Sequence, residues 1–248
     1  MSKNTIRREE QEKELVQQFF SRKNDGFFVE VGANDPVSKH SQTWYLADKH
    51  GWHGILIEPI KELADKAREK RPESKVYQVA CGQPGAEPAT TLFIPSKKGT
   101  EYTTHASLQK EIDGQRFPAY REQEVKVMTL NEIFAAEDVK HIDLLSIDTE
   151  GTELEVLRGI DLEKYRPTLI ILEDKHVFLD KHLHLIRNGY RPAKRMGMNM
   201  WYIPKGEPFG RATLKERLKL FKRLYLSLLP RKIKAAWRLK SWHPLLRI

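Results

Sequence analysis

Short apolar runs alternate with polar segments along most of the chain, and several runs end at a glycine or an acidic residue. Runs of this length, apolar at successive positions, are typical of strands that are buried on both faces of a sheet. The pattern predicts strands at residues 27–31, 54–59, 75–81, 90–95, 125–130, 142–148, 167–173 and 198–204.

Amphipathic segments lie between these runs and predict helices at residues 5–20, 41–50, 60–70, 131–137, 182–190 and 211–229. Strands that alternate with helices at this spacing indicate an α/β fold. We expect a doubly wound, mostly parallel sheet with helices on both faces. Residues 96–124 are polar and read as a loop. The loop either lines the pocket of a substrate, through Tyr102, His105, Ser107 and Tyr120, or lies in solvent.

The composition fits one folded core with an appendage, since the chain has 248 residues of which 40% are hydrophobic. We expect an N-terminal helix (1–26), a central domain (27–206) and a helical tail (207–248). The polar N-terminus lacks the apolar core of an export signal, and no apolar run is long enough to span a bilayer. The single cysteine, Cys81, suits a reducing compartment. A cytoplasmic location is therefore expected.

The net charge of +9 is confined to the tail. Residues 205–248 contain 13 basic and 2 acidic residues, a net charge of +11, which leaves −2 for the first 204 residues. Helical spacing places apolar residues of the tail on one face, and Pro230 is expected to end that helix; Trp237 and Trp242 follow. The apolar face consists of Leu214, Leu218, Phe221, Tyr225 and Leu228. This pattern favours an anionic membrane surface as partner. The alternatives are that the tail packs on the rest of the chain, residues 1–204, which we call the body, that it packs on another subunit, or that it binds nucleic acid.

Acidic residues stand where the predicted strands end, and ligands of parallel sheets bind beyond the carboxyl ends of strands. Glu30 lies inside an apolar strand and needs a partner, either loop amides or the ammonium group of a ligand. Glu58 follows Gly32 by 26 residues, the spacing of an acid that binds ribose hydroxyls; a solvated carboxylate is the alternative.

The loop after the first strand reads Gly32-Ala33-Asn34-Asp35 and contains neither G-x-G-x-x-G nor a P-loop motif. Few amides are then free to bind a pyrophosphate, so a nucleoside ligand without phosphate is favoured. S-adenosylmethionine meets this requirement. Its adenosine would lie at Glu58, and its charged end near Glu30 and Asn34.

Four segments, "FFVEVGAND", "GWHGILIEP", "IDLLSIDTEGTELEVLRG" and "LIILEDKHVF", resemble the FkbM-type family of S-adenosylmethionine-dependent methyltransferases. The resemblance implies a class I methyltransferase fold with a seven-stranded sheet that includes an antiparallel strand, and methyl transfer, usually to a sugar hydroxyl. It also implies roles for individual residues: Glu30 and Gly32 in the first cofactor motif, Glu58 on ribose, Ala80 and Cys81 at the adenine edge, and Asp148 and Glu150 as signature carboxylates. Ser146 stands where the family often has lysine.

An acceptor hydroxyl needs a base as its proton leaves. The candidates are Asp148, Glu150, Glu173 and His176, of which His176 is best tuned near neutral pH; it could instead cap a loop carbonyl. Asp148, Glu173 and His176 could also hold a divalent cation, although their spacing does not demand one and no metal is favoured. Thr152 to Glu155 matches a capping box, which would leave Glu153 facing solvent or the site.

The sequence thus predicts an O-methyltransferase that acts on a saccharide of a surface polysaccharide or a lipid-linked glycan. An RNA methyltransferase that grips phosphates with its basic tail is the second reading, and a membrane-attached scaffold without activity is the third. The body's charge of −2 argues against nucleic acid. The sequence leaves open the acceptor, the use of a metal and the oligomeric state.

Overall fold

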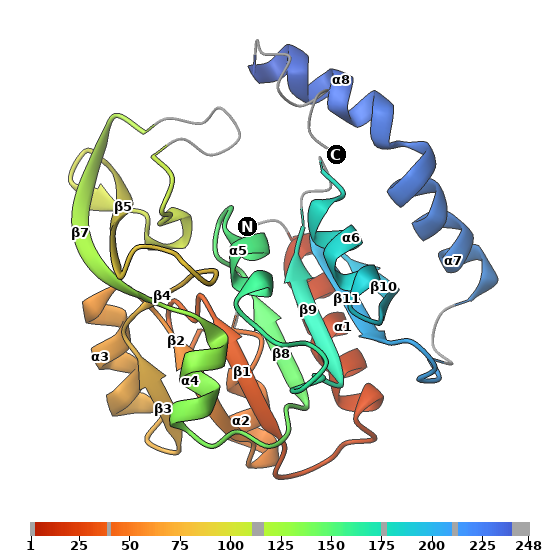
Figure 1. Ribbon diagram of the computed structural model, residues 1–248, viewed down its shortest axis with the longest axis horizontal. Coiled ribbons are helices and arrows are strands. Elements are labelled where there is room, and N and C mark those ends of the chain that lie inside the picture. The colour runs from red at the N-terminus through yellow and green to blue at the C-terminus, as the bar shows by residue number, and fades with distance from the viewer. Residues whose placement is uncertain (1–2, 39–40, 111–116, 175–177, 210–212, 240–248) are drawn as a thin grey trace.

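A computed structural model describes residues 3–38, 41–110, 117–174, 178–209 and 213–239. Its central sheet has seven strands in the order β10-β11-β9-β8-β1-β2-β3 (Figure 1). Their bounds are β1 Phe27–Val31, β2 His53–Ile57, β3 Ser74–Tyr77, β8 Leu144–Ile147, β9 Leu169–Glu173, β10 Tyr190–Met196 and β11 Asn199–Pro204. Strands β3, β2, β1, β8 and β9 pair in parallel, whereas β11 is antiparallel to both β9 and β10. The α/β class is as predicted, and seven strands agree with what the family resemblance implied. The expected doubly wound, mostly parallel sheet is not confirmed, because this sheet is mixed.

Helices pack on both faces of this sheet. Helices α1 (Lys3–Phe19), α2 (Trp44–His50) and α3 (Lys61–Lys70) lie on one face, and α4 (Leu130–Ala136), α5 (Glu153–Arg158) and α6 (Asp180–Arg187) lie on the other. Along β1, Phe28 packs toward the first group and Val29 toward the second, because successive side chains of a strand point to opposite faces. Burial on both sides explains why the strands read as continuous apolar runs.

A buried carboxylate of helix α1, that of Glu12, binds two side chains of β11. Glu12 accepts one hydrogen bond from the indole of Trp201 and one from the side-chain amide of Asn199, each at 2.8 Å. Val16, one turn further along, is fully buried in the core on the same face. The N-terminal helix is therefore bound to β11 in the described part of the chain.

A second sheet has the order β4-β7-β5-β6 and corrects two predictions. Its strands are β4 Ala80–Cys81, β5 Ala89–Lys97, β6 Thr100–Glu101 and β7 Ala119–Met128. The predicted strand 75–81 is wrong in extent, because the chain leaves the central sheet after Tyr77 and Ala80–Cys81 pair with Val127–Met128. Residues 96–124 are also not a loop throughout, since they contain β6, a 3-10 turn at Thr103–His105 and most of β7. We call residues 80–128 the lobe.

Strand β10 was not predicted, because its sequence contains Pro192 and several basic residues. Such residues are typical of an edge strand, where proline costs no ladder hydrogen bond and charge opposes further pairing. β10 is indeed the outer strand of the central sheet. Among the described residues, no helix has both the length and the apolar composition needed to cross a membrane.

The tail forms helix α7 (Leu214–Phe221), a π-helical turn (Lys222–Leu226) and helix α8 (Leu228–Leu239), which run along the outside of the molecule (Figure 1). The prediction that Pro230 ends the helix is wrong. Pro230 lies in the first turn of α8, where backbone N–H groups have no partner within the helix and proline is tolerated. We call residues 213–239 the C-terminal arm.

Candidate functional site

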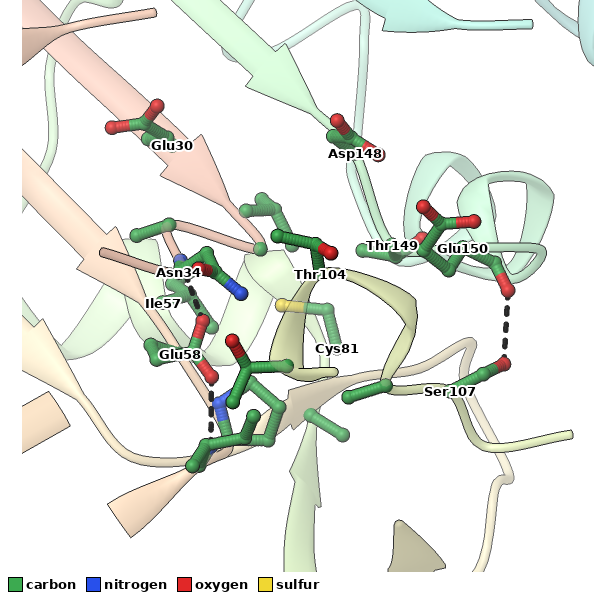
Figure 2. A pocket seen from close by; sticks show the side chains of 18 of the residues that line it. Glu30, Asn34, Ile57, Glu58, Cys81, Thr104, Ser107, Asp148, Thr149 and Glu150 are labelled. Carbon is green, nitrogen blue, oxygen red and sulfur yellow. Dashed lines mark hydrogen bonds between the residues drawn. The ribbon is translucent and has the colours of Figure 1, made fainter. Parts of the chain in front are cut away.

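A pocket opens at the carboxyl ends of β1, β2 and β8, beneath the 3-10 turn of the lobe (Figure 2). Its volume is about 230 Å³. A single buried water needs only ~10–15 Å³ on a comparable measure, so the pocket is far larger than a packing defect. It lies where the sequence predicted a ligand, beyond the ends of the parallel strands.

At Gly32 the backbone that follows β1 lies in close contact with the backbone that follows β8. Its φ angle is +80°, and a Cβ atom at this position would lie 1.8 Å from the backbone oxygen of Asp148. Asn34, two residues later, also has a positive φ (46°), which asparagine tolerates better than most residues. The loop after β1 therefore requires a positive φ at positions 32 and 34, and the sequence supplies glycine and asparagine there.

The backbone amides of this loop are already hydrogen-bonded within the chain. Those of Gly32 and Ala33 donate to the carbonyl of Ile57, at 2.9 and 3.1 Å. Those of the next two residues donate to Glu58 Oε2 (2.7 Å) and to the Asn34 side chain (2.8 Å). Four successive amides are thus occupied, which agrees with the prediction that the loop does not bind a phosphate.

Glu58 is buried at the end of β2, and its carboxylate forms part of the pocket wall (Figure 2). The backbone N–H of Asn34 donates to Oε2, and that of Ile60 donates to Oε1 at 2.8 Å. A carboxylate has about four acceptor sites, so two remain for a ligand. Burial raises the pKa of Glu58 to about 7, against the two amide hydrogen bonds and with help from the charge of Glu30.

Glu30 is also buried, and its partners belong to the protein. Its carboxylate accepts hydrogen bonds from Ser41 Oγ (3.1 and 3.2 Å), Gln42 N (2.9 Å) and Thr43 Oγ1 (2.5 Å), and Arg71 Nη1 lies 3.5 Å away. These contacts fix the start of α2 to β1. Glu30 also borders the pocket, and its predicted contact with a cofactor stays a prediction.

One wall of the pocket is apolar, and sequence analysis recognised only part of it. Ala80 and Cys81 line the pocket as expected, next to Val79, and burial raises the pKa of the Cys81 thiol, so the side chain behaves as a small apolar group. The residues that were missed are Ile60, Leu92 and Leu108, which pack together with the lobe. Alternation of apolar positions in 90–95 was the available signal for Leu92.

Asp148 follows β8 and faces the pocket opposite Glu58 (Figure 2). Among the described residues, carboxylate oxygens of Asp148, Glu150 and Glu173 lie within 4.8 Å of one another, close enough to share a cation. The Asp148 side chain is exposed at the pocket, but the protein atoms crowded around its carboxyl group raise its pKa, and the charges of Glu173 and Glu150 raise the pKa further. This cluster favours a bound proton or a positively charged ligand.

Glu153 faces neither solvent nor the pocket, because its side chain is buried behind the turn that follows β8, and the predicted capping box is wrong. The Thr152 side chain makes no cap hydrogen bond. Instead, Glu153 Oε1 accepts from the Gly151 amide at 2.8 Å, and Oε2 binds Lys181 Nζ at 3.1 Å. Burial lowers the pKa of Lys181, but Glu153 and Asp174 outweigh it, so the net pKa is raised. Glu153 of α5 and Lys181 of α6 therefore stabilise the turn at residues 148–151, which follows β8.

The lobe reaches over the pocket through Ser107, whose hydroxyl donates to the carbonyl of Glu150 at 2.9 Å (Figure 2). Ser107 and Thr104 line the pocket. Tyr102, His105 and Tyr120 do not; their rings pack around Phe117 on the outer side of the lobe. Of the four acceptor-pocket candidates, Ser107 alone lines this cavity.

The structure brings Glu30, Gly32, Asn34, Glu58, Ala80, Cys81, Asp148 and Glu150 to one pocket. Glu173 lies beside it, within the carboxylate cluster. His176, the preferred base in the sequence interpretation, lies outside the described residues, so that assignment stays a prediction.

Comparison with known proteins identifies the domain. The family model described as "Methyltransferase FkbM domain" matches residues 30–192, more than half of the chain. The matched range begins at Glu30 and contains every pocket residue that was predicted. No curated protein matches the chain.

Proposed function

Because the chain belongs to the FkbM methyltransferase family, we propose that it is an S-adenosylmethionine-dependent O-methyltransferase whose acceptor is a sugar hydroxyl. The acceptor belongs to a surface polysaccharide or a lipid-linked glycan. The enzyme acts in the cytoplasm, at the inner face of the membrane.

One observation carries the choice of cofactor: the pocket combines acidic side chains with loop amides that are already occupied. A pyrophosphate would meet the carboxylates of Glu58 and Asp148 and would find the amides of residues 32–35 already hydrogen-bonded. A nucleoside with a positively charged sulfonium avoids both difficulties. Its ribose hydroxyls can donate to the two acceptor sites of Glu58 that the protein leaves open.

The apolar wall of Ile60, Leu92 and Leu108 suits the flat adenine ring. When bound, S-adenosylmethionine supplies an electrophilic methyl group on a sulfonium. The residues of the chain align the acceptor hydroxyl with that group, an effect that can contribute roughly 7–11 kcal/mol. Asp148, which faces the pocket directly after β8, would accept the proton that leaves the acceptor hydroxyl.

The proposal is tested by incubating the protein with methyl-labelled S-adenosylmethionine and a glycolipid fraction from a lysate. We expect label in the glycan portion, released with the sugar by mild acid. Label in RNA from the same lysate, or no transfer to any fraction while the cofactor binds, would contradict the assignment of the acceptor class.

Cofactor affinity should depend on pH through Glu58. In the folded protein the pKa of Glu58 is raised from 4.5 to about 7, so its contribution to stability is fully present below pH 4.5 and is lost as pH rises through 7. Ribose hydroxyls donate best to the ionised form, so binding should strengthen over the same rise. We expect the dissociation constant for S-adenosylmethionine to fall about tenfold between pH 6 and pH 8. Calorimetry at both pH values measures this, and Glu58→Gln should remove the dependence; a dependence that survives in Glu58→Gln would assign it to another group.

A further inference from the structure

The C-terminal arm has an inner face that is attached to the body. Leu224 is 1% exposed and belongs to the core between the central sheet and helices α4 to α6. The Tyr225 hydroxyl lies 2.7 Å from His182 Nε2 of α6, and Glu216 accepts from Lys194 Nζ of β10 at 2.9 Å. Because these contacts lie on both helical segments before α8, the arm holds a defined position on the body.

The outer face of the arm is apolar and uncovered. Its large side chains are between 44% and 84% exposed, whereas such residues normally pack in a core or an interface. The face consists of Leu214, Leu218, Phe221, Tyr225, Leu226, Leu229, Ile233 and Trp237. The predicted apolar stripe is thus exposed at Leu214, Leu218 and Phe221. Tyr225, its fourth position, is exposed on one side and contacts His182 of the body through its hydroxyl.

The π-helical turn keeps this face continuous. The amide of Ser227 donates to the carbonyl of Lys222, five residues earlier, so one turn contains an extra residue. In an uninterrupted α-helix, positions 226, 229, 233 and 237 would drift off the line set by 214, 218 and 221. The five-residue step from Phe221 to Leu226 returns them to it. The Arg231 guanidinium donates to the carbonyls of Ser227 and Arg223 near this irregular turn, where Pro230 lacks an N–H.

Basic side chains border the apolar face. Helical spacing places Lys215 and Lys222 along one edge of the face and Arg217 along the other, and all three are exposed. The whole arm contains nine basic residues and one acidic residue. An exposed apolar face with cations along both edges matches a bilayer with anionic headgroups, where the apolar side chains enter the acyl boundary and the cations stay with the lipid phosphates.

We propose that the C-terminal arm is a docking surface for an anionic lipid bilayer. In Figure 1, α8 lies toward the same end of the molecule as α5 and the tips of β5 and β7, the end that carries the pocket. Docking would therefore bring the site close to acceptors attached to the membrane. This last consequence rests on the proposed function, whereas lipid binding itself does not.

Vesicle flotation of the full chain tests the proposal. Wild-type protein should float with phosphatidylcholine vesicles that contain phosphatidylglycerol, and at least tenfold less with pure phosphatidylcholine. The double variant Leu218→Ser/Phe221→Ser should lose at least tenfold in binding. Met198→Ser is the matched control, since Met198 is 54% exposed outside the arm, and it should float as wild type.

Charge is tested separately. Lys215→Gln/Lys222→Gln should weaken flotation severalfold, and Lys97→Gln/Lys98→Gln, an equal change of charge at exposed positions in the lobe, should not. Equal flotation of wild type and the Leu218/Phe221 variant would overturn the proposal. The proposal would also be overturned if the wild-type protein did not bind vesicles but bound RNA, or formed a concentration-dependent dimer, through an interaction that the Leu218/Phe221 variant abolishes. Calorimetry of the same variants with S-adenosylmethionine keeps the outcomes apart, because cofactor binding should be unchanged whether or not the membrane proposal holds.

Discussion

Replacing Gly32 with alanine is expected to reduce the affinity for S-adenosylmethionine by more than 100-fold. The new Cβ would lie 1.8 Å from the backbone oxygen of Asp148, and a backbone atom cannot rotate away as a side chain can. To relieve the clash, the loop after β1 or the turn after β8 must move. The first movement pulls the Asn34 amide from Glu58, and the second displaces Asp148, so the pocket loses its geometry in both cases.

Gly85→Ala is the matched control for this variant. Gly85 has nearly the same φ, +78°, but no atom lies within 4 Å of its added Cβ. It should show only the strain of a left-handed residue, roughly 1–2 kcal/mol of stability, and retain cofactor binding. Calorimetric titration and chemical unfolding of both variants measure the difference. If Gly32→Ala bound the cofactor as Gly85→Ala does, the loop would not be the site.

Replacing Asp148 with asparagine should have the largest effect on turnover. Asparagine keeps the size of the side chain and removes the carboxylate that we propose as the proton acceptor. General-base catalysis contributes about 10²–10⁴-fold, so kcat should fall by that factor while the affinity for the cofactor changes only severalfold. Label transfer under single-turnover conditions measures the chemical step directly.

The same assay ranks the candidate bases. Glu150→Gln should lower kcat less than Asp148→Asn, because Glu150 acts on Asp148 through its charge. His176→Ala should leave most of the chemical step intact. Should His176→Ala abolish transfer while Asp148→Asn remains active, the base would be His176, as the sequence interpretation preferred.

The site was more predictable than its surroundings, and the reason is local. Residues such as Gly32, Glu58 and Asp148 stand directly after strands, so once each strand is recognised its end residues must meet at one edge of a parallel sheet. Their meeting point depends on strand order alone. The hydrogen bonds of Glu30 could not be predicted in the same way, because Ser41 and Arg71 approach it from other elements.

The errors arise where tertiary pairing overrides the local pattern. Nothing in "KVYQVAC" shows that Ala80 and Cys81 leave the sheet of Tyr77, since their partners in the sequence, Val127 and Met128, lie 47 residues later. The register of the arm depends on a π-helical turn that its apolar spacing alone does not indicate. The Thr152 motif has the residues of a capping box, but Glu153 captures the amide of Gly151 instead.

The central claim is that the acidic pocket at the ends of β1, β2 and β8 binds a sulfonium nucleoside and rejects a phosphate-bearing one. Calorimetric titration of the full chain with S-adenosylmethionine and, separately, with NAD tests it most directly. We expect one equivalent of S-adenosylmethionine to bind, none of NAD, and loss of the S-adenosylmethionine signal in Glu58→Ala. Binding of NAD that depends on Glu58, or no binding of S-adenosylmethionine to the wild-type protein, would contradict it.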